Sequence, residues 1–585
     1  MRTRALQYLY LQKPVSTIVF LCLLSVLPWA ATNSFSTKGE PREAAVAVSM
    51  LESGDWTLPK VYADEFAYKP PMMHWLETIA SLPGGEVTEF SSRLPSAIAF
   101  TVLLACVLLF FGKRVRFQEA FIATLLLLTC VEIHRAGLAA RVDMLLTAFT
   151  VTGLFAMYRW EDNLELKGLP ITIPILLGGA ILTKGPVGLV VPLFVFAVYI
   201  AMLRRYRWTK IVKSLVYVAV SSALIPSVWY IEAWRMGGGE FADVVLAENF
   251  GRFFHLQTPG INYELGHENG AWYNFLTLAA GFVPWTLLLV ISFFGLKYKK
   301  PAGRFAEWIA DIWRGILSLD KIRLFSLVAS VCIVFFYCLP SSKRSVYLMP
   351  AYPFIALFIA QYLLIFIERH SRVMRIFSVV MATIAAVVVA ASVLQMTGAL
   401  DLNILSAQYL SKPSQLMTVQ AVAKSLSPSA IVLSVLALVA AMLITVCYQI
   451  WRKSNIKMLY STIFLMFALN LFIDGVVMRG VHSEGSAKPF ATELRRDFPI
   501  DRDNIFVVNN LRKYANLYGL NFYLGNCFHN IDIEQPASGY FLAAEKDIDA
   551  IAAERAHYVF TVVRTSERYF PETHGRIVLC RFQLR

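Results

Sequence analysis

Residues 39–75 read GEPREAAVAVSMLESGDWTLPKVYADEFAYKPPMMHW, a polar stretch that lies between two segments apolar enough to cross a membrane. A run of helix-forming residues starts at Glu40 and stops at Gly54, where a glycine can end a helix in the left-handed conformation. The pattern predicts a short helix on the membrane surface, with the Glu40 carboxylate at its amino end, where the helix dipole favours negative charge. The Lys-Pro-Pro sequence at 69–71 and the aromatic Trp75 then supply a fixed cation and an interfacial anchor.

The composition indicates a protein that crosses the membrane many times. The chain has 585 residues, of which 57% are hydrophobic and only 16% are charged, and its mean hydropathy is +0.56. The net charge of +14 could suggest a nucleic-acid partner. However, the cations cluster in short loops beside apolar runs, which is how membrane proteins set their orientation, so we expect no nucleic acid.

Apolar runs of spanning length can be placed about thirteen times along the chain. They lie near 15–32, 96–112, 118–133, 143–158, 169–183, 186–203, 214–232, 275–296, 324–340, 347–367, 376–397, 428–450 and 458–477. Alternate connecting loops are rich in Lys and Arg, and these loops are cytoplasmic by the positive-inside rule. The N-terminus is therefore predicted to be cytoplasmic, and an odd number of spans places the C-terminus outside.

The composition changes after residue 477, where charge rises and short runs alternate in character. Strands are expected near 504–508, 539–542, 557–563 and 576–582, and helices near 511–524 and 545–554. We therefore predict a transmembrane domain over 1–477 and a small α/β domain over 478–585 outside the membrane. The pattern of this second domain suggests no catalytic group of residues.

Ionisable residues at the predicted outer ends of the spans are the candidates for chemistry. Asp143 lies at the edge of one span, where it either acts on a substrate or pairs with Arg135 or Arg141. Lys184, in the turn LTKGP, either extends to the membrane surface or meets an anionic group such as a lipid phosphate. The adjacent cations Lys343 and Arg344 oppose the positive-inside rule, which favours a role at an anionic ligand.

Several of these segments resemble one family of membrane enzymes. They are GEPREA followed by KPP, the R-x-D-x-L spacing around Asp143, LTKGP, and the SxKRxxYLxPxxP pattern at 341–353. Together they are similar to the GT-C glycosyltransferases that use polyprenyl-phosphate sugars. That branch includes the aminoarabinose transferases, which modify lipid A, and more distantly the protein O-mannosyltransferases.

The resemblance implies a polytopic α-helical GT-C fold with about thirteen spans and an extracytoplasmic α/β C-terminal domain. It implies an inverting glycosyltransferase of the bacterial inner membrane, with an active site formed by the periplasmic loops 33–95 and 233–274. The donor would be a polyprenyl-phosphate sugar, and the acceptor lipid A, another glycolipid or a protein. The implied catalytic acids are Glu40 and Asp143, and the implied substrate-binding residues are Arg42, Lys69, Lys184, Arg252, His267, Lys343, Arg344 and Tyr347.

The chain departs from the family at two positions. Gly39 stands where many relatives have Asp, so Glu40 either takes over the role of that acid or is structural. Tyr68 stands where some relatives have a Glu that helps to bind a metal, so no cofactor is certain, although Glu65 and His267 leave a divalent metal site open. The alternative functions are a transporter or flippase for a lipid-linked sugar, which should show inverted repeats, and a non-catalytic membrane scaffold.

Overall fold

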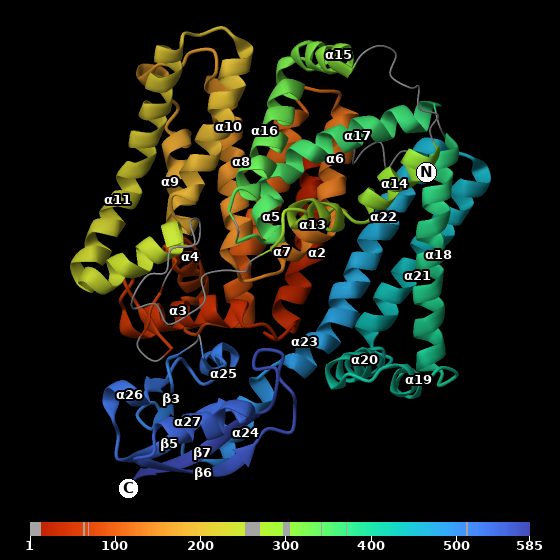
Figure 1. Ribbon diagram of the computed structural model, residues 1–585. Helices are drawn as coiled ribbons and strands as arrows, with labels where there is room; N and C mark the ends of the chain where they lie inside the picture. The colour runs from red at the N-terminus through yellow and green to blue at the C-terminus, as the bar shows by residue number, and fades with distance from the viewer. Residues whose placement is uncertain are drawn as a thin grey trace.

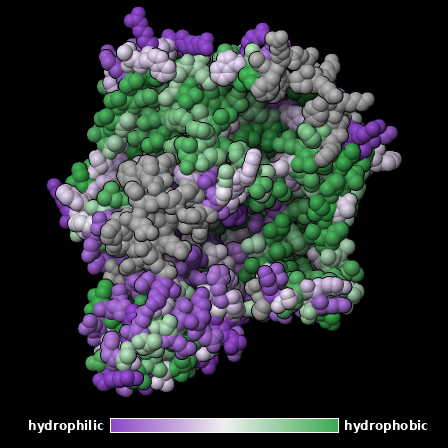
Figure 2. All heavy atoms as spheres, viewed as in Figure 1, coloured by the Kyte–Doolittle hydropathy of each residue, from purple (hydrophilic) through white to green (hydrophobic). Residues whose placement is uncertain are grey.

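The computed structural model describes residues 13–62, 65–67, 69–251, 269–295, 305–340, 342–369, 371–510 and 513–585. Figure 1 shows a bundle of long helices with a smaller unit of strands and short helices at one end. In Figure 2 hydrophobic residues form a broad band over the bundle, while hydrophilic residues gather on the small unit and along the opposite edge. A protein with this distribution of surface is suited to lie in a bilayer.

Within the described residues, eight helices are long and apolar enough to cross a membrane, or up to ten if two bent pairs each form one span. The eight involve α2 (Pro14–Thr32), α5 (Glu89–Phe111), α11 (Trp208–Leu246), α16 (Lys321–Cys338), α17 (Tyr352–Arg369), α18 (Ser371–Met396), α21 (Ala430–Arg452) and α22 (Asn455–Phe472). The bent pairs are α6 (Phe117–Thr129) with α7 (Val131–Gly137), at 67°, and α13 (Tyr273–Gly281) with α14 (Trp285–Gly295), at 106°. The polytopic helical class is confirmed, whereas the count of thirteen spans stays a prediction.

Two shorter apolar helices, α9 (Thr172–Lys184) and α10 (Val187–Leu203), occupy positions where spans were expected. They follow α8 (Val142–Trp160), which has 19 residues. Helix α9 has 13 residues, so at about 1.5 Å per residue it is roughly 20 Å long, shorter than the roughly 30 Å hydrocarbon core. Helix α9 ends at Lys184, and the side chain of Lys184 contacts Asp143 in the first turn of α8.

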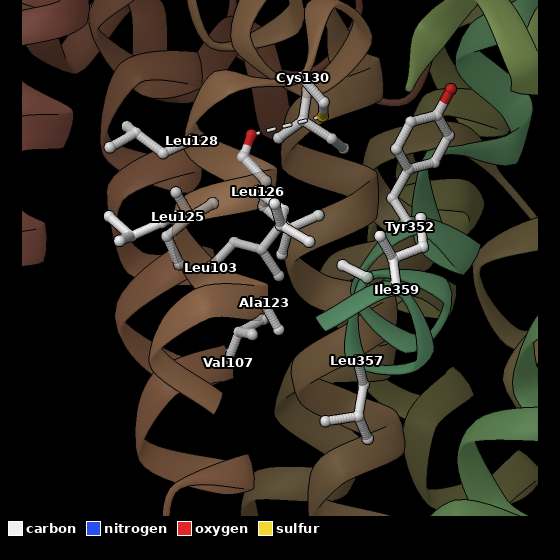
Figure 3. Close-up of a cluster of buried hydrophobic side chains, with 14 of the residues drawn as sticks. Leu103, Val107, Ala123, Leu125, Leu126, Leu128, Cys130, Tyr352, Leu357 and Ile359 are labelled. Atoms are coloured by element: carbon white, nitrogen blue, oxygen red, sulfur yellow. Dashed lines mark hydrogen bonds between the residues drawn. The ribbon is translucent and has the colours of Figure 1, made fainter. Parts of the chain in front are cut away.

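The core of the bundle is packed by aliphatic side chains from helices far apart in the sequence. Figure 3 shows Leu103 and Val107 of α5 beside Ala123 and Leu126 of α6, with Leu357 of α17 nearby. All five side chains have no exposed surface. Burying an aliphatic side chain of this size stabilises a fold by about 1.5–3 kcal/mol in water, but in lipid the gain comes from close packing instead.

A layer formed by α3 (Gly39–Ser53), β1 (Lys60–Val61), β2 (Glu65–Phe66) and α4 (Met72–Ser81) lies across one end of the bundle (Figure 1). We call it the capping layer. The predicted helix is confirmed as α3, which ends at Gly54 with a left-handed φ of +72°. It does not lie on an open surface: the C-terminal unit packs on it through α25 (Tyr518–Tyr523), α4 packs against it as well, and most of its side chains are buried.

The C-terminal unit contains a five-stranded sheet with the strand order β4-β3-β5-β7-β6. Strand β3 pairs in parallel with β4 and β5, and β7 pairs antiparallel with β5 and β6. The strands are β3 (Ile505–Val507), β4 (His529–Asn530), β5 (Ser538–Ala544), β6 (Tyr558–Thr565) and β7 (Ile577–Leu584). The unit's helices are α24 (Lys488–Asp497), α25, α26 (Ile531–Glu534) and α27 (Ile548–Glu554). The predicted α/β class of this unit is confirmed.

The remaining described elements are short and connect these parts. They are η1 (Leu166–Gly168), η2 (Ala247–Gly251), α15 (Phe305–Leu317), η3 (Ser345–Ala351), α19 (Leu402–Tyr409), α20 (Pro413–Ser425), η4 (Ile473–Met478), α23 (Arg479–Gly485) and η5 (Glu545–Asp547).

One predicted helix of the C-terminal unit is mostly irregular, for a reason that lies elsewhere in the chain. Of the stretch 511–524, only α25 is helical among the described residues. The backbone N–H of Leu517 donates a hydrogen bond to the hydroxyl of Tyr62 at 3.1 Å, so it is not available to a helix. Tyr62 comes from the capping layer and inserts into the core of the C-terminal unit, with ring centroids 4.8 Å from Tyr518 and 5.7 Å from Phe528.

Candidate active site

Asp143 is at the centre of a charged cluster at the capped end of the bundle. It lies in the first turn of α8, and its side chain is 6% exposed. The Lys184 ammonium donates a hydrogen bond to Oδ1 of Asp143, and Arg141 Nε lies 3.7 Å from Oδ2. Two cations from different segments therefore approach the two oxygens of one carboxylate.

The segment 343–347 completes this cluster. The ammonium of Lys184 lies 4.3 Å from the centre of the Tyr347 ring, an arrangement that attracts a cation to the ring face. The positive charge of Arg344 also acts on the Asp143 carboxylate. The structure thus brings together Asp143, Lys184, Arg344 and Tyr347, four of the residues selected from the sequence.

Lys343 is turned to a different partner. Its ammonium donates to the carbonyl of Asn269 at 3.2 Å, and Asn269 Nδ2 returns a hydrogen bond of 3.0 Å to the Lys343 carbonyl. Lys343 is 7% exposed, so its charge is largely shielded from water. A buried ammonium is stabilised by an anionic group nearby, so this position suits a cation that binds an anionic ligand.

Glu40 forms a buried ion pair with Arg93 of α5. Arg93 Nε and Nη2 donate to the two Glu40 oxygens at 2.8 and 3.2 Å, and the Ala140 N–H donates to Oε1 at 3.1 Å. Glu40 is 5% exposed and Arg93 is 2% exposed. Arg93 also donates to the carbonyls of Ala30 and Asn33, so it joins the ends of α2, α3 and α5.

The electrostatics keep Glu40 ionised. Burial alone would raise the pKa of Glu40, but the charge and hydrogen bonds of Arg93 and the N–H of Ala140 hold that pKa below its ordinary value. Because the Glu40 carboxylate accepts a hydrogen bond from the Ala140 N–H, it fixes the backbone segment that leads to Asp143. Glu40 and Asp143 are therefore linked through the backbone between 140 and 143.

The two remaining predicted cations of the capping layer form ion pairs. Arg42 Nη2 lies 2.7 Å from Glu43 Oε1, and His74 Nε2 lies 3.0 Å from the other oxygen of Glu43. Lys69 donates a hydrogen bond to Glu248 at 2.7 Å, which joins the KPP turn to η2, the segment that follows α11. Arg42, Glu43, Lys69 and His74 line one small cavity beneath the C-terminal unit.

Parts of the chain are similar to known membrane transferases. Residues 68–230 match the family described as dolichyl-phosphate-mannose-protein mannosyltransferase. A protein of Shewanella sediminis named undecaprenyl phosphate-alpha-4-amino-4-deoxy-L-arabinose arabinosyl transferase is 23% identical over 62% of this chain and 62% of its own length. A protein of Erwinia tasmaniensis with the same name is 23% identical over 55% of this chain and 54% of its own. The chain thus spans about three fifths or less of the curated relatives that it matches.

The structural comparison covers nearly the whole chain. A crystal structure of ArnT from Cupriavidus metallidurans bound to undecaprenyl phosphate aligns with 97% of both chains, with a TM-score of 0.69 and 17% identity. This chain has the ArnT fold. The predicted GT-C architecture with a small C-terminal α/β unit is therefore confirmed.

The sequence leaves a divalent metal site open at Glu65 and His267, without making one certain. His267 and Arg252 lie outside the described residues. Burial raises the pKa of Glu65 to about 7, although a hydrogen bond from Asn509 and the charge of Arg42 act in the opposite direction. Among the described residues, no group of three or more His, Cys, Asp and Glu side chains could hold a metal ion.

Two partners of site residues, Arg93 and Glu248, were not predicted from the sequence. A signal for Arg93 was present, since a charged residue within an apolar helix is costly unless it is paired. The predicted span began at 96, whereas α5 begins at Glu89 and therefore includes Arg93. Glu248 had no comparable signal, because its partner Lys69 lies 179 residues away in the sequence.

Proposed function

We propose that this chain is an integral-membrane glycosyltransferase. It transfers a sugar from a polyprenyl-phosphate donor to an acceptor, most favourably lipid A or another glycolipid, and with inversion at the anomeric carbon. The curated relatives are named for undecaprenyl phosphate-linked aminoarabinose, and the similar crystal structure holds undecaprenyl phosphate. The donor class of this chain is inferred from those names together with the site itself.

The observation that carries the proposal is the convergence of three cations from separate segments on Asp143. Lys184 and Arg141 contact this carboxylate, and the charge of Arg344 acts on it. Cations grouped in this way at the capped end of the membrane helices are suited to bind the phosphate of a polyprenyl phosphate.

The reaction breaks the bond between the anomeric carbon and the donor phosphate oxygen, and forms a bond from that carbon to an acceptor oxygen. We assign Lys184, Lys343 and Arg344 to the departing phosphate, whose negative charge rises as the bond breaks. Tyr347 provides a hydroxyl for a donor oxygen, and Asp143 orients the sugar or accepts the proton of a hydroxyl nucleophile. Lys69 and Arg42 lie at the capping-layer side of the site, where they can meet further substrate oxygens.

Glu40 takes a positioning role in this proposal. Both of its oxygens are bonded to Arg93, and one of them also holds Ala140. A carboxylate used in this way has little capacity left for a substrate proton. It instead fixes the backbone that presents Asp143, so the second acid carries the chemistry.

We place the chain in the bacterial inner membrane, with a cytoplasmic N-terminus and a periplasmic domain over 478–585. Ion pairs support two distinct sides. The loop ends near Glu119, Glu161 and Asp162 are joined by Arg205, Lys321 and Arg323. Lys488 of the C-terminal unit pairs instead with Glu89 at the amino end of α5, whereas the carboxyl end of α5 leads to the loop before Glu119. The loops at the Glu119 side are rich in basic residues, which favours the cytoplasmic side for them.

The experiment is a transfer assay with purified protein in lipid nanodiscs. Radiolabelled polyprenyl-phosphate sugars are supplied with lipid A, a glycolipid or a peptide, and the labelled acceptor is measured. Asp143→Asn should reduce transfer by about a hundredfold to ten-thousandfold if a hydroxyl is the nucleophile. Asp162→Asn is the matched control, because Asp162 is exposed and lies at the other side of the bundle. Full transfer by Asp143→Asn would refute the proposed site.

A further inference from the structure

The absence of a side chain at Gly39 is linked to the position of Arg141. A Cβ atom added at Gly39 would lie 1.9 Å from Arg141 Nη1 and 2.9 Å from its Cζ. The guanidinium therefore occupies the space in which a side chain at position 39 would begin.

The Arg141 guanidinium makes few polar contacts with the described part of the protein. Within the part of the chain that the structure describes, its guanidinium makes no hydrogen bond, and its one ion pair is the 3.7 Å approach to Asp143. Its side chain is 30% exposed, whereas the carboxylate beside it is 6% exposed. A guanidinium has five N–H donors in a fixed planar fork, so Arg141 presents several donors to the open side of the site.

The surroundings favour an anion in front of this guanidinium. Gly39 is the first residue of α3, and Arg141 is the residue that precedes α8, so two helix amino ends meet here. Helix amino ends favour negative charge, and a cation placed beside them is unfavourable until an anion compensates it. Asp143 cannot compensate it alone, because its other oxygen already accepts a hydrogen bond from Lys184.

We propose that Arg141, in the space left by Gly39, is a substrate-binding residue that holds a phosphate oxygen of a lipid substrate. Lys184 and Arg141 approach different oxygens of Asp143, so they lie on two sides of this acid. A phosphate on the Arg141 side can belong to the polyprenyl donor or to a phosphorylated acceptor lipid. This inference rests on the proposed function, and it extends the site by one residue and one contact.

The first test measures binding of two probes to protein in nanodiscs. The probes are undecaprenyl phosphate and bisphosphorylated lipid A, each titrated against the wild type, Arg141→Gln and Arg141→Lys. Arg141→Gln should weaken at least one probe by about tenfold to a hundredfold, since a bidentate charged contact is lost. Arg141→Lys keeps the charge without the fork, so it should lie between the other two.

A second variant removes the contact without removing the charge. Gly39→Ala places a methyl group where the guanidinium lies, so Arg141 must move, although alanine suits the helix better than glycine does. We expect weaker binding with unchanged or higher thermal stability, a combination that a purely structural role would not produce. Arg135→Gln is the control, because it removes a cation six residues away that is 60% exposed and pairs with Glu132.

The two probes separate the outcomes. Weaker binding of undecaprenyl phosphate alone assigns Arg141 to the donor, and weaker binding of lipid A alone assigns it to the acceptor. Unchanged affinity of both probes in Arg141→Gln, with a wild type that binds at least one, would overturn this inference and leave the proposed function standing. A wild type that binds neither probe would overturn both.

Discussion

The ion pair between Glu40 and Arg93 gives a quantitative prediction for Glu40→Gln. If Glu40 were only a catalytic base, this isosteric change would abolish transfer and leave stability unaltered. The structure predicts a loss of stability as well, because Arg93 is 2% exposed and would keep its charge without its partner. Removing one member of a buried ion pair typically destabilises a protein by about 3–5 kcal/mol.

The expected value lies at the lower end of that range. Glutamine retains one oxygen that can accept from Arg93, and the arginine keeps its hydrogen bonds to the carbonyls of Ala30 and Asn33. We therefore expect Glu40→Gln to lower the free energy of unfolding by about 3 kcal/mol. The double variant Glu40→Gln/Arg93→Met leaves no charge at this pair. Its loss in free energy of unfolding should therefore be smaller than the sum of the losses in the two single variants.

The assay is a denaturing-detergent titration of the four proteins of this double-mutant cycle, followed by intrinsic fluorescence. A coupling free energy of at least about 1.5 kcal/mol is expected, since the two side chains are in direct contact. Glu89→Gln with Lys488→Met forms a control cycle for a half-exposed pair, for which about 0.2–1 kcal/mol is expected. Additivity of the Glu40 and Arg93 changes within about 0.5 kcal/mol would refute the positioning role.

Three further predictions concern charge, pH and topology. Lys343→Gln/Arg344→Gln should weaken the binding of undecaprenyl phosphate by about tenfold to a hundredfold, and an unchanged dissociation constant would remove these cations from the donor site. Burial raises the pKa of Glu65 from 4.5 to about 7, so its contribution to stability is complete below about pH 4.5 and is lost as the pH rises through about 7. Glu65→Gln should therefore flatten the pH dependence of the free energy of unfolding, by up to about 3 kcal/mol at pH 8, and parallel profiles of wild type and variant would contradict this. Cys527 and Cys580 are buried, so topology is better probed by Ser538→Cys, which should react with an impermeant thiol reagent from the periplasmic side, while Lys453→Cys should not.

Local signals in the sequence were sufficient for some of these features. The limits of α3 follow from Glu40 and Gly54, because helix-terminal preferences act within a few residues. Two kinds of local signal indicate site residues: the cost of placing charge at a membrane edge, and the sequence motifs. The structure brings together four residues that these signals indicate, namely Asp143, Lys184, Arg344 and Tyr347. Their common location reflects the topology of the spans, which hydropathy and basic loops largely determine.

The pairings between distant segments could not be read in the same way. Glu40 and Arg93 are 53 residues apart, and Lys69 and Glu248 are 179 apart. Which acid meets which cation depends on helix packing, which a single sequence does not encode in any local pattern. The irregular stretch before α25 has the same origin, since its backbone bonds to Tyr62 and tertiary contacts override helix propensity.

The insertion of Tyr62 into the C-terminal unit has a consequence for biosynthesis. The backbone of Tyr62 bonds to Asn526, a residue made 464 positions later. In the orientation proposed above, the capping layer is exported before its partner is translated, and it can pack against that partner only after nearly the whole chain has been inserted. Chains that stop before residue 505 would then leave the Tyr62 ring exposed on the outer side, where proteases that recognise unassembled proteins act. We expect the last step of assembly, rather than insertion of the spans, to limit how much complete protein a cell accumulates.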